Sequence, residues 1–119
     1  MSFPLANTLP KEERLCGKTT VSALIAGGRW GSTAHMKYCF LCGGEGGLNR
    51  IMVSVPKKFF KRAVKRNLLK RRIREAYRTR KELLSVKGAD ILFQYNSPEI
   101  VDFQIICEEV AGVLRRISR

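Results

Sequence analysis

The chain has 119 residues, which suits one domain around a single hydrophobic core and excludes an ordinary multi-domain protein. Its apolar fraction of 45% and charged fraction of 28% are normal for a globular protein, but 23 Lys and Arg stand against 10 Asp and Glu, giving a net charge of +13. Between Lys57 and Glu82 there are 13 basic and 2 acidic residues, so this segment carries +11 of that charge. Such a concentration is typical of a face that binds RNA or DNA, because bound cations release the counterions condensed on the phosphates.

A membrane surface is the competing polyanion. The sequence has no run of about 18 apolar residues and no apolar stretch near its N-terminus that resembles a signal sequence. We therefore expect no membrane partner, no export and a cytoplasmic protein. In a reducing cytosol the four cysteines are expected to stay reduced and to pack as small buried hydrophobes: Cys16, Cys39, Cys42 and Cys107.

The N-terminal part predicts a tail followed by a helix. Residues 1–10 contain two prolines and no period, so they suit a loose tail. A loosely helical pattern begins at Lys11 and stops at Gly27-Gly28, because glycine accepts the conformation that closes a helix. Gly17 divides this stretch into a turn and the helix proper.

Two or three strands follow this helix. Trp30 and then residues 36–42 (MKYCFLC) form an aromatic and apolar run that predicts strand structure. Residues 43–47 (GGEGG) have too little side chain to pack and predict a flexible loop. The alternation of apolar residues over 50–55 predicts another strand, which Pro56 ends.

The basic segment has the period of a helix. Lys70, Arg71, Arg74 and Arg78 fall on one side of it, opposite a stripe made of Leu69, Ile73, Ala76, Tyr77, Leu83 and Leu84. Extending this helix backwards would place Arg62, Lys65 and Arg66 in the apolar stripe, where unpaired charge is costly. Either the helix starts near Arg66, or its first turns project beyond the sheet.

The C-terminal part predicts a strand over 89–95 and a final amphipathic helix. Ser97, Pro98 and Glu99 have the residue types of a helix start, with serine as the cap. The predicted fold is therefore a single α+β domain, residues 1–119, with one sheet of about four strands and helices packed on it in the order α-β-β-β-α-β-α.

No motif predicts catalysis or a metal site. Gly17-Lys18-Thr19-Thr20 resembles the end of a phosphate-binding loop, but Glu12 stands where its first glycine belongs. Cys39 and Cys42 have the spacing of half a zinc site without a second ligand pair, so we interpret them as two buried thiols. The ten acids are dispersed, whereas a protein nuclease needs clustered carboxylates or an acid–base pair.

The basic segment is better explained by binding than by solvation. Solvated helix faces usually interleave both signs of charge, and here Glu75 and Glu82 stand nearly alone among the cations. Asn67, amid those cations, suits either a helix cap or a hydrogen bond to RNA.

Residues 63–76 (AVKRNLLKRRIREA) closely resemble the signature of the bacterial ribonuclease P protein subunit, with its Arg-Asn-x-x-Lys-Arg-x-x-Arg core. Residues 53–58 (VSVPKK) are similar to the strand that leads into it, and the resemblance covers roughly residues 11–95. It implies a left-handed crossover at the basic segment. It also implies that a catalytic RNA, not the protein, removes the 5′ leader from precursor tRNA, with Mg²⁺ in the holoenzyme and one protein expected per RNA.

The resemblance assigns roles to particular residues. The principal RNA-facing residues would be Arg66, Asn67, Lys70, Arg71 and Arg74, supported by Lys57, Lys58, Arg62 and Lys65. The family also holds single-stranded leader in a cleft between its first helix and the sheet. Here Val21 and Ile25 stand where the family usually has phenylalanines, and Tyr38 and Phe40 are candidates for the missing contact, with an ordinary core position as the alternative.

Three other functions remain as alternatives. A ribosomal or other structural RNA-binding protein could use the same basic helix, and it would leave tRNA maturation unaffected. A self-sufficient nuclease would cleave RNA without an RNA subunit, which the dispersed acids argue against. A DNA-binding module is weaker still, because the cations cover more helix than base reading needs.

Overall fold

The computed structural model describes residues 18–42, 49–84 and 88–118. The elements along the chain are α1 (Lys18–Gly27), β1 (Arg29–Ser32), β2 (Met36–Leu41), β3 (Arg50–Ser54), α2 (Ala63–Arg80), the short 3₁₀ helix η4 (Lys81–Leu83), β4 (Asp90–Tyr95) and α3 (Phe103–Ile117). This order confirms the predicted α+β fold. The predicted tail, the predicted turn before Gly17 and the predicted loop at 43–47 lie outside the described residues. No described helix is long and apolar enough to cross a membrane.

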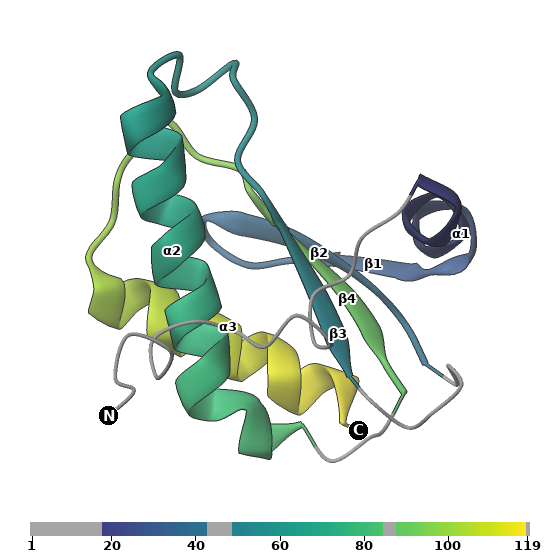
Figure 1. The fold of residues 1–119 in the computed structure, drawn as a ribbon. Helices are drawn as coiled ribbons and strands as arrows, with labels where there is room; N and C mark the ends of the chain where they lie inside the picture. The colour runs from purple at the N-terminus through teal and green to yellow at the C-terminus, as the bar shows by residue number, and fades with distance from the viewer. Residues whose placement is uncertain (1–17, 43–48, 85–87, 119) are drawn as a thin grey trace, which may run out of the picture.

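The four strands form one mixed sheet in the order β1-β2-β4-β3 (Figure 1). β2 is antiparallel to both β1 and β4, whereas β3 is parallel to β4. β4 lies inside the sheet, and its central residues Ile91, Leu92 and Phe93 are all buried, which matches their continuous apolar run.

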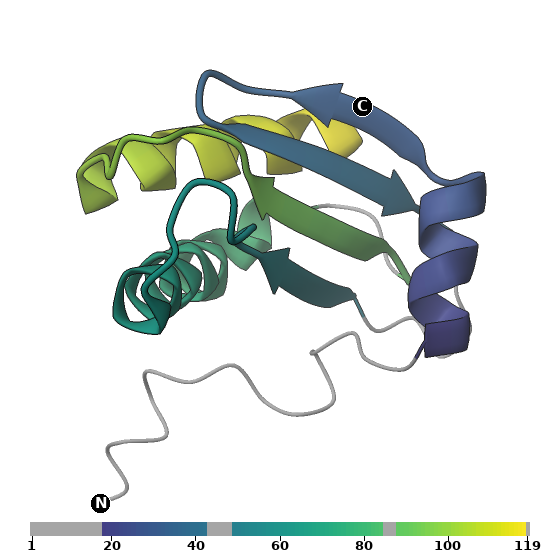
Figure 2. The same cartoon turned by 90° about the horizontal axis from the view of Figure 1, so that it is seen from above.

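The two faces of the sheet are covered by different helices. Met36, Tyr38, Ile51 and Phe93 belong to the main core, which α2 and α3 complete from one side. On the other face Cys39 and Leu92 pack against Leu24 of α1. Figure 2 shows α1 apart from the other two helices, at the far end of the sheet. The described helices therefore form three layers with the sheet, and they fully cover only one of its faces.

The β3–α2–β4 connection joins two parallel neighbours, and Figures 1 and 2 together show it as a left-handed crossover. Connections of this type are almost always right-handed, because the twist of the strands favours that hand. The left-handed path that the resemblance implies is therefore present at the basic segment. It places α2 beside the edge strand β3 and against α3.

The buried stripe of α2 is as predicted, with Leu69, Ile73, Ala76 and Tyr77 at no more than 1% exposure. The helix begins at Ala63, and Figure 1 shows its first turns beyond the ends of the strands. Val64 there is 79% exposed. This settles the phase conflict of the sequence: Arg62 and Lys65 stay exposed at the projecting first turn, and the half-buried Arg66 is bonded to backbone carbonyls.

α1 touches the sheet at a position that requires glycine. A Cβ on Gly28 would lie 2.5 Å from both Cys39 Sγ and the Leu24 carbonyl oxygen. The backbone N–H of Gly28 donates to that same carbonyl at 2.7 Å, and the Cys39 thiol lies 3.4 Å from it. The predicted stop signal therefore ends the helix and also sets how closely α1 approaches β2.

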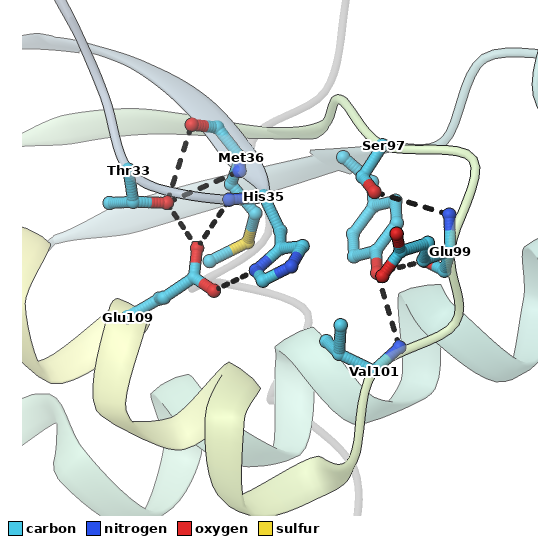
Figure 3. Close-up of polar contacts among 8 residues, drawn as sticks. Thr33, His35, Met36, Ser97, Glu99, Val101 and Glu109 are labelled. Atoms are coloured by element: carbon cyan, nitrogen blue, oxygen red, sulfur yellow. Dashed lines mark hydrogen bonds and ion pairs between the residues drawn. The ribbon is translucent and has the colours of Figure 1, made fainter.

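The predicted start of the last helix was wrong by several residues. α3 begins at Phe103 after Asp102, and residues 97–102 instead form an irregular segment. Ser97 does accept a bond from the Glu99 N–H at 3.1 Å, as a cap would. The Tyr95 hydroxyl, however, donates to the Glu99 carbonyl and accepts from the Val101 N–H, which holds the segment out of helical geometry (Figure 3). Burial raises the pKa of Tyr95, so the phenol keeps the proton that it donates.

Candidate nucleic-acid interface

The exposed side of α2 forms a basic ridge. Asn67, Lys70, Arg71 and Arg74 lie within an arc of about 100° on the helix, beside or opposite the buried stripe. Asn67, Arg71 and Arg74 are exposed, and Lys70 is half-buried. Lys65 and Arg62 lie off this arc but are exposed at the projecting first turn. The sequence therefore predicted a set of residues that the fold does bring together.

Arg66 has a different role from its neighbours. It is half-buried, and its Nη1 donates to the carbonyls of Phe60 at 2.8 Å and Lys61 at 2.7 Å. Those bonds fix the segment between β3 and α2, on which Lys57 and Lys58 are exposed. A guanidinium has five N–H donors and Nη1 carries two, so three more are available in the side chain. Arg66 thus positions the cationic segment before it and retains donors for an anion.

The sheet separates the four residues predicted for the leader cleft. Val21 and Ile25 belong to α1, where Val21 packs on the small cluster and Ile25 is 46% exposed. Tyr38 and Phe40 point to the opposite face, because they alternate with Cys39 on β2. Tyr38 is 5% exposed in the main core and Phe40 packs against that core. Placing this pair in the cleft was therefore wrong, and the alternative of ordinary core residues holds.

A different aromatic residue lies on the cleft side of the sheet. Trp30 pairs with Cys39 across β1 and β2, so both share the face that carries α1, and Trp30 is 47% exposed. Lys37 of β2 shares this face, and its Nζ lies 5.9 Å from the centre of the Trp30 ring. We call these two residues the Trp30–Lys37 platform. The only signal in the sequence was that Trp30 begins a run that predicts strand structure, and its face of the sheet is defined only once the strands are paired.

The platform continues across the sheet toward the basic ridge. Lys37 pairs with Gln94 of β4, and Gln94 pairs with Ser54 at the end of β3. Both Gln94 and Ser54 are half-buried on the side that α1 leaves uncovered. The chain leaves β3 at Ser54 and reaches Lys57 three residues later. A polar row thus connects the platform to the cationic segment.

The single histidine belongs to a structural clasp. His35 Nδ1 lies 2.6 Å from Glu109 Oε2, and the His35 backbone N–H donates to Glu109 Oε1 at 2.9 Å (Figure 3). The Thr33 hydroxyl bonds to the same carboxylate. Histidine is therefore not placed between a nucleophile and an acid, as hydrolytic triads require. The three residues tie the β1–β2 turn to α3.

The cysteines match the prediction only in part. Cys39 and Cys107 are buried, and burial raises the pKa of both thiols, so they remain neutral. Cys42 is exposed one residue after β2 ends, so the prediction of a second buried thiol was wrong there, and Cys16 lies outside the described residues. In the ranges 18–42, 49–84 and 88–118, no three His, Cys, Asp or Glu side chains gather closely enough to hold a metal ion.

Comparison with known proteins gives one consistent result. The family model described as Ribonuclease P matches residues 9–118. The chain belongs to the ribonuclease P protein family.

Relatives within the ribonuclease P family support this at the level of sequence and structure. The ribonuclease P protein component of Porphyromonas gingivalis is 33% identical over 99% of this chain and 92% of its own length. The ribonuclease P protein structure from Thermotoga maritima superposes with a TM-score of 0.78, at 28% identity, over 88% of this chain and 97% of that one. The Staphylococcus aureus protein, at 23% identity and a TM-score of 0.76, shares the fold.

The clasp predicts a loss of stability when its carboxylate is removed. Glu109→Ala leaves the His35 N–H and the Thr33 hydroxyl without their carboxylate, so we expect the free energy of unfolding to fall by about 1–3 kcal/mol in urea denaturation. The control is Glu108→Ala, because that neighbour is exposed and should change stability by less than about 0.5 kcal/mol. Equal losses in the two variants would contradict the clasp.

Proposed function

We propose that the chain binds the catalytic RNA of ribonuclease P along the basic ridge and holds the 5′ leader of precursor tRNA on the open face of the sheet. Membership of the family places it in tRNA 5′ processing by this endoribonuclease. The observation that carries the proposal is the arrangement of the motif: Asn67, Lys70, Arg71 and Arg74 share one accessible arc of α2, where phosphates can reach them together.

The division of labour follows from what the described side chains offer. Three of the described carboxylates are bonded within the protein: Glu75 pairs with Arg78, Asp90 pairs with Arg50, and Glu109 binds His35 in the clasp. We propose that the Mg²⁺ ions of the holoenzyme are held by RNA phosphates, and that the protein acts in the cytoplasm as one copy per RNA. Protein cations and Mg²⁺ both neutralise phosphate charge, so the protein should lower the Mg²⁺ concentration that the RNA requires.

The leader is the ligand that suits the open face. An exposed tryptophan with a lysine beside it offers a stacking surface and a cation, which accept any base and fit a leader of variable sequence. Val21 and Ile25 border this face from α1 with aliphatic rather than aromatic contact. We propose that Trp30 supplies the aromatic contact that α1 lacks.

Reconstitution tests the function as a whole. We expect the chain to restore precursor tRNA cleavage by a bacterial ribonuclease P RNA at a Mg²⁺ concentration where that RNA alone is slow. The protein alone should cleave nothing. Tight RNA binding without rescue would favour a structural RNA-binding protein, and cleavage by the protein alone would overturn the assignment of chemistry to RNA.

The ridge predicts a change in salt dependence. Lys70→Ala with Arg74→Ala should weaken binding to the catalytic RNA and reduce the slope of log affinity against log salt by up to about 2, because two phosphate contacts are lost. The matched control removes two exposed cations elsewhere, with Arg29→Ala and Arg115→Ala. An identical slope change in the control would show general attraction rather than a defined ridge.

The platform predicts a selective defect. Trp30→Ala should weaken binding of precursor tRNA to the holoenzyme by about 1–3 kcal/mol, the range for loss of one stacked base, while mature tRNA binding stays unchanged. Trp30→Phe should retain most of the affinity. Leu41→Ala is the control for lost exposed apolar surface, since Leu41 is 38% exposed on β2. If precursor and mature tRNA respond alike to Trp30→Ala, the platform does not bind the leader.

A further inference from the structure

A groove lies between α2 and α3, on the other side of the ridge from the sheet. Its lining consists of Leu68, Arg71, Arg72, Glu75 and Phe103, and its volume is about 420 Å³. Phe103 is 40% exposed although it begins a helix whose other face is buried in the core. The groove therefore has an apolar surface, formed by Leu68 and Phe103, and charged side chains around it.

The walls of the groove are fixed by internal bonds. Arg72 Nη1 donates to the Val101 carbonyl at 3.1 Å, which ties α2 to the segment that leads into Phe103. Glu75 is held by Arg78, whose Nε donates to the carboxylate at 2.9 Å. Both contacts are internal to the protein and hold the walls of the groove in place, so the entropic cost of ordering the site around an occupant is small.

The shape and charge of the groove select its occupant. A flat ring against Phe103 with an anionic group near a guanidinium matches a nucleotide, because bases stack on aromatic side chains and arginine pairs with phosphate. The volume lies in the range of sites for small organic ligands. A second copy of the chain fits poorly, because it would bring another segment with a net charge of +11 against this one.

Arg71 makes the groove continuous with the ridge. On the helix it lies between Asn67 and Arg74 on one side and Leu68 and Glu75 on the other. RNA bound to the ridge therefore passes directly over the mouth of the groove. We propose that the groove takes one unpaired nucleotide of the RNA subunit, with its base stacked on Phe103 and its phosphate on Arg71. This inference rests on the proposed binding of RNA by the ridge.

The test compares three substitutions of Phe103 in binding to a bacterial ribonuclease P RNA over a salt series. We expect Phe103→Ala and Phe103→Leu to weaken binding by about 5- to 100-fold, and Phe103→Tyr to remain within about 3-fold of wild type. The salt slope should not change, because stacking releases no counterions. Ile105→Ala is the control, because Ile105 is 37% exposed on the same helix and does not line the groove.

Thermal unfolding of each variant separates binding from folding. If Phe103→Ala does not fold, the affinities of Phe103→Leu and Phe103→Tyr for the RNA decide whether a base stacks on residue 103. Both substitutions keep the apolar bulk, and only tyrosine keeps the aromatic ring. Chemical probing should reveal a base that is protected by wild type and by Phe103→Tyr but not by Phe103→Leu.

Three results would overturn the proposal. Wild-type affinity in both the alanine and the leucine variants would show that nothing stacks on Phe103. Self-association of the free protein that Phe103→Ala abolishes, seen by sedimentation, would make the groove a protein interface. Failure of the wild type to bind the RNA at all would overturn the proposed function as well, and so differs from a defect confined to Phe103.

Discussion

The burial of one apolar stripe holds a highly charged helix against the domain. Leu69, Ile73 and Tyr77 are at most 1% exposed, and Tyr77 also meets Phe93 of β4 with ring centres 6.4 Å apart. Burying each large apolar side chain contributes about 1.5–3 kcal/mol, whereas two like charges 4 Å apart in water cost about 1 kcal/mol and are screened further by salt. Burial therefore outweighs the repulsion along α2, and the cations stay on the exposed side, where an RNA can offset what repulsion remains.

The pairing of the strands decides which surfaces are available for binding. Alternation along β2 places Tyr38 and Phe40 on one face and Lys37 and Cys39 on the other. The first face is closed by α2 and α3, while α1 covers only part of the second. Among the described strands, the exposed aromatic surface lies on the second face, where Trp30 provides it from the edge strand.

Local patterns in the sequence predicted the helices and strands well, but they did not predict which of these elements pack against one another. The α2 stripe and the alternation of Ile51 and Val53 were readable, because each depends on periodicity within one segment. The sequence also showed that Tyr38 and Phe40 share a face. It did not show which helix covers that face, since this depends on the strand order and on the hand of the crossover. The wrong prediction of a helix start at Ser97 has a similar cause. The Ser97 side chain does accept a capping bond, but bonds from Tyr95 and Arg72 hold the segment in a non-helical conformation.

The candidate interface shows the same limit. The signature residues could be predicted to lie together because a helix brings positions three and four apart onto one side, whereas their RNA-facing roles come from the family resemblance. The role of Arg66 in fixing the segment from Phe60 to Lys61 could not be predicted. Its acceptors are backbone carbonyls, which every residue has, so the residue types give no sign of these bonds. Trp30 and Phe103 were also hidden: each is an aromatic residue at the start of an element, and only tertiary packing leaves it exposed.

A protein that contributes no catalytic group to the reaction must act by positioning. Three surfaces meet around α2: the ridge, the polar row that leads from Ser54 to the Trp30–Lys37 platform, and the groove at Phe103. The cations between them attract any RNA, so charge alone cannot tell the catalytic RNA from the substrate leader. The two proposed stacking sites lie on opposite sides of the ridge, and stacking of this kind requires unpaired bases. If both proposals hold, the ridge supplies affinity, and Trp30 and Phe103 determine which strand lies on which side.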